Sequence, residues 1–327
     1  MSQNLSEQAK GKTDQLIDYV NNQIELLAFD DPEPFLLRQM VESLADPRRA
    51  TRLNLVESFS QIGEPATPFL LEGITHHSES VVRRACCNAL TNIGDPESVP
   101  GLIKALTHDP DIGVKSAAAG ALAKIGAPAF DSLRDVLASE NASESCKGHA
   151  AWAVASMSSE VSDRLYRIVR DPSPSVRTAA VGAIAHLAQK HTVPQESIPL
   201  EIGQPHQGHL QPARRKTDRP RTERINRAMT VLTEALSDHS SEVRVEAAAN
   251  LARLNCQKAY QPLIACLKDS AAAVRQAAAM ALAKLGNPDA IEEIEHLQQD
   301  AEASVQRVAA LAIEQLRAIA QAEKSVK

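Results

Sequence analysis

A sequence repeat of 31 or 32 residues recurs along most of this 327-residue chain, and few folds are built from repeats of this length. Residues 82–94 superpose on residues 114–126 with a shift of 32 positions. Further along, Val243, Val274 and Val305 follow one another at intervals of 31 residues. Repetition at this length is typical of solenoids, in which each repeat packs only on its neighbours. The chain is therefore expected to be a stack of similar units.

Residues 81–109 contain one complete unit. In its first half, small or apolar residues recur every three or four positions, which predicts a helix with one apolar stripe. Gly94 suits the end of that helix, and Asp95 followed by Pro96 suits the start of the next. A second apolar stripe begins at Val99. Neither helix can bury its stripe alone, so we expect an all-α solenoid of antiparallel helix pairs, a right-handed superhelix of about seven to eight repeats.

The pattern divides the chain into four regions. Residues 1–45 are predicted to form N-terminal capping helices, and residues 46–190 a first repeat block. Residues 191–222 are rich in Pro and Arg and lack a helical stripe, which predicts a flexible linker. Residues 223–327 are predicted to form a second repeat block that ends in a C-terminal cap.

Composition excludes several classes of protein. The formal net charge of −6 argues against a general nucleic-acid binder. No apolar run approaches the roughly 18 residues that a membrane helix needs. The first twenty residues lack a secretory pattern, and the five cysteines show no paired spacing. We therefore expect a cytoplasmic protein with reduced thiols and no transmembrane segment.

No catalytic or metal-binding motif stands in the sequence. Nucleophile elbows, phosphate-binding loops, dinucleotide fingerprints and zinc clusters are absent, and the ten histidines show no paired-ligand spacing. We predict no catalytic residue and no metal site, and the question of enzymatic activity stays open at this point.

Cys146 is the one cysteine whose surroundings suggest chemistry. It precedes Lys147, stands near His149, and falls in the first turn of a predicted helix, where a thiolate could be stabilised. The alternative is that Cys146 is a small buried hydrophobe, which is our prediction for the other four cysteines.

A basic residue recurs once per repeat at one position of the first helix. Its members are Arg83, Lys115, Lys147, Arg177, Arg244 and Arg275, with Arg307 shifted by one. We expect salt bridges between repeats that use the acidic residue shortly before, as from Glu242 to Arg244. The alternative is an exposed basic stripe that binds an acidic partner.

A second basic cluster lies at residues 214–227, where seven basic residues outnumber two acids. Such a cluster is either a solvated linker or a contact for RNA, anionic membrane or acidic protein. The absence of aromatic residues between the charges disfavours nucleic acid.

Two further surfaces are candidates for binding. Glu97, Lys104 and His108 fall on one ridge of a predicted second helix, away from its apolar stripe, and we expect that ridge to be exposed. His149 and Trp152 share one face of a first helix. Trp152, the single tryptophan, either fills a junction between repeats or docks a partner.

The repeat completed by "IGDPESVPGLIKAL" resembles the HEAT-like repeat of the cyanobacterial phycobilin lyase group. That group includes the E/F-type lyases and related proteins of phycobilisome degradation. The segment "KGHAAWAV" is similar to the tryptophan-bearing first helix of these lyases, with Trp152 at an aromatic position. The resemblance covers both repeat blocks.

This resemblance implies two alternative functions. One is a non-catalytic scaffold whose concave surface binds phycobiliprotein subunits or a phycobilisome-associated factor. The other is a lyase or lyase subunit that attaches or removes a linear tetrapyrrole, such as phycocyanobilin, at a client cysteine. The residues that we assign to either task are Arg83, Arg84, Lys104, His149 and Trp152. The sequence predicts no oligomeric state.

Overall fold

A computed structural model describes residues 2–25, 33–157, 161–192 and 218–326. In these segments every regular element is a helix, and none is a strand. The chain forms two compact units, Met1–Asp163 and Arg164–Lys327. The predicted all-α HEAT-like solenoid class is confirmed. Among the described helices, none combines the length and the apolar character that crossing a membrane requires.

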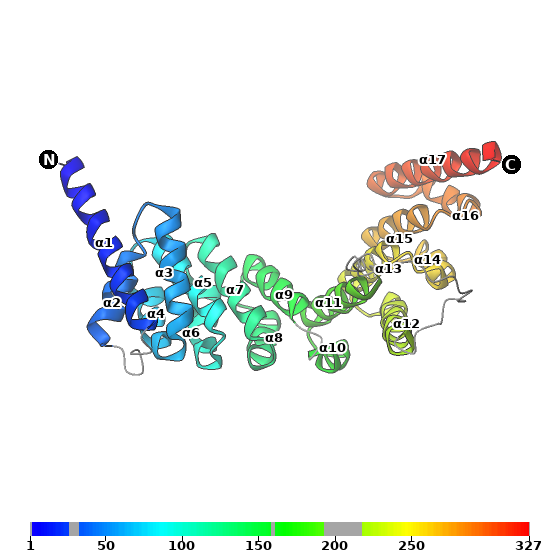
Figure 1. Cartoon of the computed structure of the whole chain (residues 1–327). Coiled ribbons are helices and arrows are strands. Elements are labelled where there is room, and N and C mark those ends of the chain that lie inside the picture. The colour runs from blue at the N-terminus through cyan, green and yellow to red at the C-terminus, as the bar shows by residue number, and fades with distance from the viewer. Residues whose placement is uncertain (1, 26–32, 158–160, 193–217, 327) are drawn as a thin grey trace, which may run out of the picture. The chain divides into compact units, whose positions relative to one another are not determined.

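The first unit consists of two layers of stacked helices (Figure 1). One layer contains the first helix of each pair: α3 Arg49–Ile62, α5 Ser80–Ile93, α7 Ile112–Ile125 and α9 Glu144–Ser156. The other layer contains α2 Pro34–Ser43, α4 Thr67–His76, α6 Val99–His108 and α8 Phe130–Ala138. The N-terminal helix α1, Ser2–Glu25, packs against α3.

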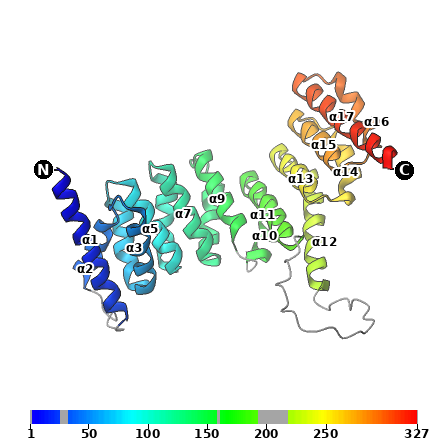
Figure 2. The ribbon, with the colours of Figure 1, turned by 45° about the horizontal axis from the view of Figure 1, so that its top comes forward.

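The second unit repeats this arrangement (Figure 2). Its first helices are α11 Pro174–Thr192, α13 Ser241–Arg253, α15 Ala272–Leu285 and α17 Ala303–Val326. Its second helices are α12 Asp218–Glu234, α14 Tyr260–Cys266 and α16 Ala290–Glu295, and the short α10, Ser162–Ile168, spans the division between the units. Because α11 packs on α12, residues 193–217 connect the two helices of one pair.

The division between the units at residue 163 differs from the boundaries predicted from the sequence, which place a linker at 191–222. Residues 193–217 lie outside the described part of the chain, as do Arg214, Arg215 and Lys216 of the basic cluster. Residues 191–192 and 218–222 of the predicted linker are helical, in α11 and α12, so its predicted bounds are too wide. For residues 193–217 the linker stays a prediction.

Glycines with positive φ end four of the first helices. Gly63, Gly94, Gly126 and Gly286 have φ between 74° and 77°, a conformation that glycine adopts without a Cβ clash. After α13 the same place is taken by Asn255, with φ 50°. As predicted, the Asp95 side chain caps the next turn by accepting a hydrogen bond from Glu97 N at 2.9 Å. That turn is the 3-10 segment η2, Pro96–Ser98, which precedes α6.

Small residues let the helices of the core approach closely. The buried faces of α7 and α15 consist largely of alanine with a few aliphatic side chains. All five cysteines are free and buried. Burial raises the pKa of the Cys87 thiol to about 12 and also raises those of Cys86 and Cys266. The prediction that Cys86, Cys87, Cys256 and Cys266 are small core residues is confirmed.

Candidate functional site

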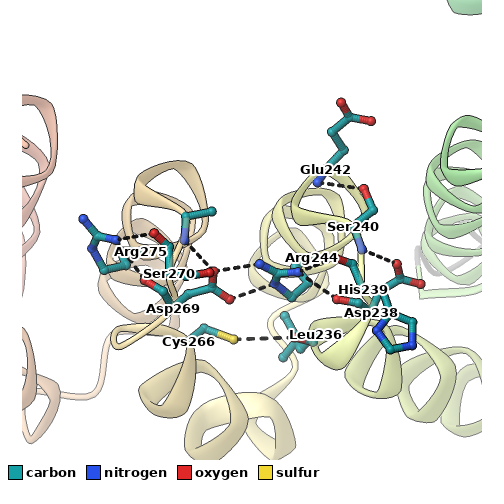
Figure 3. Close-up of polar contacts among 11 residues, drawn as sticks. Leu236, Asp238, His239, Ser240, Glu242, Arg244, Cys266, Asp269, Ser270 and Arg275 are labelled. Carbon is teal, nitrogen blue, oxygen red and sulfur yellow. Dashed lines mark hydrogen bonds and ion pairs between the residues drawn. The ribbon is translucent and has the colours of Figure 1, made fainter.

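The recurring arginine of the first helices forms a fixed bridge between successive loops (Figure 3). Arg244 donates to both carboxylate oxygens of Asp269 at 2.7 Å, from Nε and from Nη2. Its Nη1 donates to the backbone carbonyls of Asp238 and His239, at 2.8 and 3.2 Å. Asp269 Oδ1 also accepts from Ala271 N at 2.8 Å. One side chain thus joins the loop before its own helix to the loop that follows the next helix.

The same bridge occurs at four places, which together we call the Arg–Asp ladder. Its pairs are Arg83–Asp109, Arg177–Asp238, Arg244–Asp269 and Arg275–Asp300. Burial acts to raise the pKa of Asp109, but the bonds from Arg83 and from Asp111 N outweigh it and hold that pKa below its usual value. The pKa values of the other three aspartates are lowered as well. The ladder carboxylates are therefore held in their charged form.

The ladder corrects two predictions. The acidic partner of Arg244 is Asp269 and not Glu242, because residues two positions apart on a helix do not face each other. In the last repeat the ladder position belongs to Gln306, whose Nε2 donates to Asp300 O at 2.6 Å, and not to Arg307. The basic residues of the ladder are structural, and the basic-stripe alternative does not hold for them.

Lysine replaces arginine in the middle repeats, and the contacts change. Lys115 Nζ lies 3.5 Å from Cys146 Sγ. Lys147 Nζ pairs with Glu144 at 3.7 Å, and His149 Nδ1 lies 2.7 Å from Ser145 O. The cation that contacts Cys146 is therefore Lys115 rather than Lys147 or His149. Cys146 is only 2% exposed, and its sulfur also lies near backbone carbonyls of α6. These contacts do not test whether the Cys146 thiol is reactive, so a reactive thiol at this position stays a prediction.

A cleft of about 380 Å³ lies between the second helices α4 and α6. Lys104 and His108, both exposed on α6, line it as the ridge prediction requires. Arg83 and Asp109 line it too, with side chains only 10% and 6% exposed. We call this the α4–α6 cleft. It combines a buried ion pair with an exposed cation.

A second cleft of about 360 Å³ lies between α2 and α4 and also includes His77 and Ser78. In this α2–α4 cleft Arg38 pairs with Glu72 at 3.2 Å and stacks over Phe69 at 5.3 Å from the ring centre. The two clefts lie on either side of α4, and both include His77.

His77 occupies the position that an aspartate holds in the ladder. Its Nδ1 accepts a hydrogen bond from Glu79 N at 3.1 Å, as Asp109 Oδ1 accepts from Asp111 N at 2.8 Å. Its Nε2 lies 3.5 Å from Glu42 Oε2. The ring therefore takes the loop-capping role of the carboxylate, and it also lines both clefts.

A third cleft, of about 430 Å³, lies between α12 and α14 in the second unit. Its lining is mostly uncharged, with Asn226, Thr230 and Thr233, and its charged residues are Glu234 and Lys258. We call it the α12–α14 cleft. Clefts between neighbouring second helices thus occur in both units.

The other predicted binding residues lie away from these clefts. Glu97 is exposed in η2 rather than on α6, and it does not line the α4–α6 cleft. Arg84 is exposed on α5, close to Gly113. Trp152, on α9, is 54% exposed, so the prediction that it fills a repeat junction is wrong. The structure brings together Arg83, Lys104 and His108 but not Arg84, His149 or Trp152.

The sequence analysis missed the α2–α4 cleft, although the repeat contains a signal for it. A shift of 32 residues, taken from the first helices, places Lys104 on Glu72 and His108 on His76. Both Glu72 and His76 line the α2–α4 cleft. Across the described residues, no group of three or more metal-ligating side chains comes together. What the clefts offer is charge and hydrogen-bond donors for binding.

Comparison with known families identifies the repeat. A model for HEAT repeats matches residues 67–155 and 229–314, which is more than half of the chain. A second HEAT-repeat model matches residues 163–191.

Among curated proteins, the bilin biosynthesis protein MpeU of Synechococcus sp. (strain WH8020) is 42% identical over 154 residues. The match covers 47% of this chain and 52% of MpeU, so it spans about half the length of that relative. The resemblance to the phycobilin lyase group is thereby confirmed.

The solved structures that this chain matches include the complex of CpcE and CpcF of phycocyanin lyase from Nostoc sp. PCC7120. That chain is 19% identical, with 67% of this chain and 99% of that chain covered and a TM-score of 0.30. The karyopherin Kap121p, bound to the extreme C-terminus of the protein phosphatase Cdc14p, is 15% identical, with 90% and 35% covered and a TM-score of 0.48.

Proposed function

This chain belongs to the HEAT-repeat family, and from that membership we propose that it is a scaffold that binds a client protein, either a phycobiliprotein or a phycobilisome-associated factor. The observation that carries the proposal is the sequence similarity to a bilin biosynthesis protein. The clefts between second helices support it, because they present charged side chains over a rigid stack of helices. Solenoids commonly use such extended surfaces for binding.

The test is direct binding of purified phycobiliprotein subunits to the full chain, measured by biolayer interferometry. We expect saturable binding, and we expect the double variant Lys104→Met/His108→Asn to weaken it by about fivefold or more. Both side chains are exposed, so the variant should keep the thermal melting temperature of the wild type. Lys124→Met, exposed on α7 and outside the three clefts, is the matched control.

Absence of binding by the wild-type chain would contradict the scaffold. Binding that the double variant leaves unchanged would show that the client docks elsewhere than on α6.

The second candidate function is a bilin lyase or lyase subunit, and the similarity to a bilin biosynthesis protein is the observation that favours a role with bilins. The α4–α6 cleft lies within the size range of small-molecule sites, and Lys104 and His108 could pair with the propionates of a linear tetrapyrrole. The tetrapyrrole would itself be the group that is attached: the S–H of a client cysteine would add across one of its carbon–carbon double bonds, so that no leaving group is released. Phycocyanobilin mixed with the chain should then show a shifted and intensified red absorbance. An unchanged spectrum would leave the scaffold as the better proposal.

A further inference from the structure

We propose that the α4–α6 cleft is a carboxylate-binding site and that the carboxylate comes from an aspartate or glutamate of the client protein. This inference rests on the proposed function and adds to it the chemistry by which one acidic side chain of the client is recognised. It is carried by the charge balance of the cleft and by the hydrogen bonds that fix its floor.

The acid in the α4–α6 cleft already has its counter-ion. Asp109 Oδ2 accepts from Arg83 Nε at 2.7 Å, while Oδ1 accepts from Arg83 Nη2 at 2.9 Å and from Asp111 N at 2.8 Å. Arg83 Nη1 is held by the carbonyls of His77 and Ser78 at 3.1 and 2.8 Å. With both partners fixed and nearly buried, this pair is neutral as a whole and cannot turn toward a ligand.

Lys104 is left as the uncompensated charge of the cleft. In the described part of the chain its ammonium group has no ion-pair partner. Asp109 is engaged by Arg83 and by Asp111 N, and with the histidines neutral the lining of the cleft has a formal charge of +1, which an anionic ligand would balance. His108, one helical turn further along α6, adds a second hydrogen-bonding group to the same cleft.

The two other clefts lack this excess of positive charge. In the α2–α4 cleft the single cation Arg38 faces two acids, Glu42 and Glu72, so the formal balance is negative. In the α12–α14 cleft Lys258 and Glu234 balance each other. Of these three clefts, the α4–α6 cleft is therefore the one whose charge suits an anionic group.

The lining also favours a protein carboxylate over the propionate of a pigment. It contains aliphatic, hydroxyl and charged residues, together with two histidines, but no Phe, Tyr or Trp that would stack on an extended ring system. The chain as a whole has a formal net charge of −6, so the excess positive charge of this cleft is a local feature.

The site is tested with the full chain and two synthetic peptides, acetyl-hexaglutamate and acetyl-hexaglutamine, by isothermal titration calorimetry at low ionic strength. We expect the acidic peptide to bind and the amide peptide not to bind. Lys104→Met should weaken binding by about fivefold or more, the size of one partly exposed charge pair, whereas Lys104→Arg should retain it. Lys124→Met should behave as the wild type.

Equal binding of both peptides, or of the wild type and Lys104→Met, would overturn the carboxylate site. Free phycocyanobilin provides the second arm: if Lys104→Met weakens pigment binding and leaves binding of the acidic peptide unchanged, the protein carboxylate is the wrong ligand. These outcomes are separate from the proposed function, which fails when phycobiliprotein subunits do not bind the wild-type chain.

Discussion

At the scale of single residues, two ion pairs of the first unit differ mainly in burial. The side chains of Arg83 and Asp109 are 10% and 6% exposed, whereas those of Arg38 and Glu72 are 58% and 49% exposed. When one partner of the first pair is removed, the remaining charge is buried without a counter-ion. When one partner of the second pair is removed, water solvates the remaining charge. The two pairs should therefore contribute very differently to stability.

We predict that Arg83→Met lowers the free energy of unfolding by about 3–5 kcal/mol, as expected for half of a buried ion pair. Arg38→Met should cost less than about 1 kcal/mol, because exposed pairs contribute little. Thermal melting followed by circular dichroism compares the two variants. Equal losses would show that the ladder pair is no more important than a surface pair.

The ladder also predicts a dependence of stability on pH. The pKa values of Asp109, Asp238, Asp269 and Asp300 are lowered in the folded chain. Each aspartate therefore contributes stability above its unfolded pKa and loses that contribution as the pH falls through the folded pKa. The melting temperature should therefore decrease as the pH falls below about 4.

Asp109→Asn removes one of these titrations. Its melting temperature should be lower than that of the wild type at pH 7, and the difference should shrink toward pH 3. A constant difference across this range would exclude Asp109 as a source of the acid sensitivity.

At the scale of helices, close approach depends on glycine at one position of α4. A Cβ added at Gly73 would lie 2.8 Å from Val41 Cγ1 and 3.0 Å from Cys86 Sγ. Val41 is stiff at χ1 in a helix, so its side chain cannot easily turn away, and Cys86 is fully buried. Gly148 on α9, in contrast, has open space around the same position.

Gly73→Ala should destabilise the chain by about 1–3 kcal/mol through overpacking. Gly148→Ala should stabilise it by up to about 1 kcal/mol, because alanine favours the helix. Melting temperatures of the two variants should move in opposite directions. A shift of the same sign in both would contradict the close packing of α4 against α2 and α5.

Helices and turns follow from local sequence, and this explains which predictions succeed. The stripe of residues 82–93 and the cap at Asp95 depend on neighbours a few positions away, so the sequence predicts both. The partner of Arg244 is 25 residues distant, and only the folding of the helix pair brings Asp269 to it. The clefts also depend on the packing of helices that are distant in the sequence. The apolar stripe of α6 therefore predicts that Lys104 and His108 are exposed, but no local pattern predicts that His77 lines two clefts.

At the scale of the whole molecule, repeats that contact only their neighbours need not unfold together. The single tryptophan, Trp152, lies in the first unit, so its fluorescence reports on that unit alone. Circular dichroism reports on the helices of both units.

Arg275→Met breaks the ladder in the second unit. We expect urea to unfold part of the helical signal of this variant at lower concentration while the midpoint seen by Trp152 fluorescence stays as in the wild type. If both signals shift together by the same amount, the chain unfolds as one cooperative body.

The ladder has a consequence for how such a chain can grow during evolution. Arg244 and Asp269 lie within one repeat length, and the other acceptors of the arginine are backbone carbonyls, which any sequence offers. A tandem duplication of this stretch would create a new junction whose donors and acceptors already match. An added repeat therefore needs no compensating substitution in the Arg–Asp ladder. A gene of this type can gain repeats while the exposed face of each copy diverges in sequence.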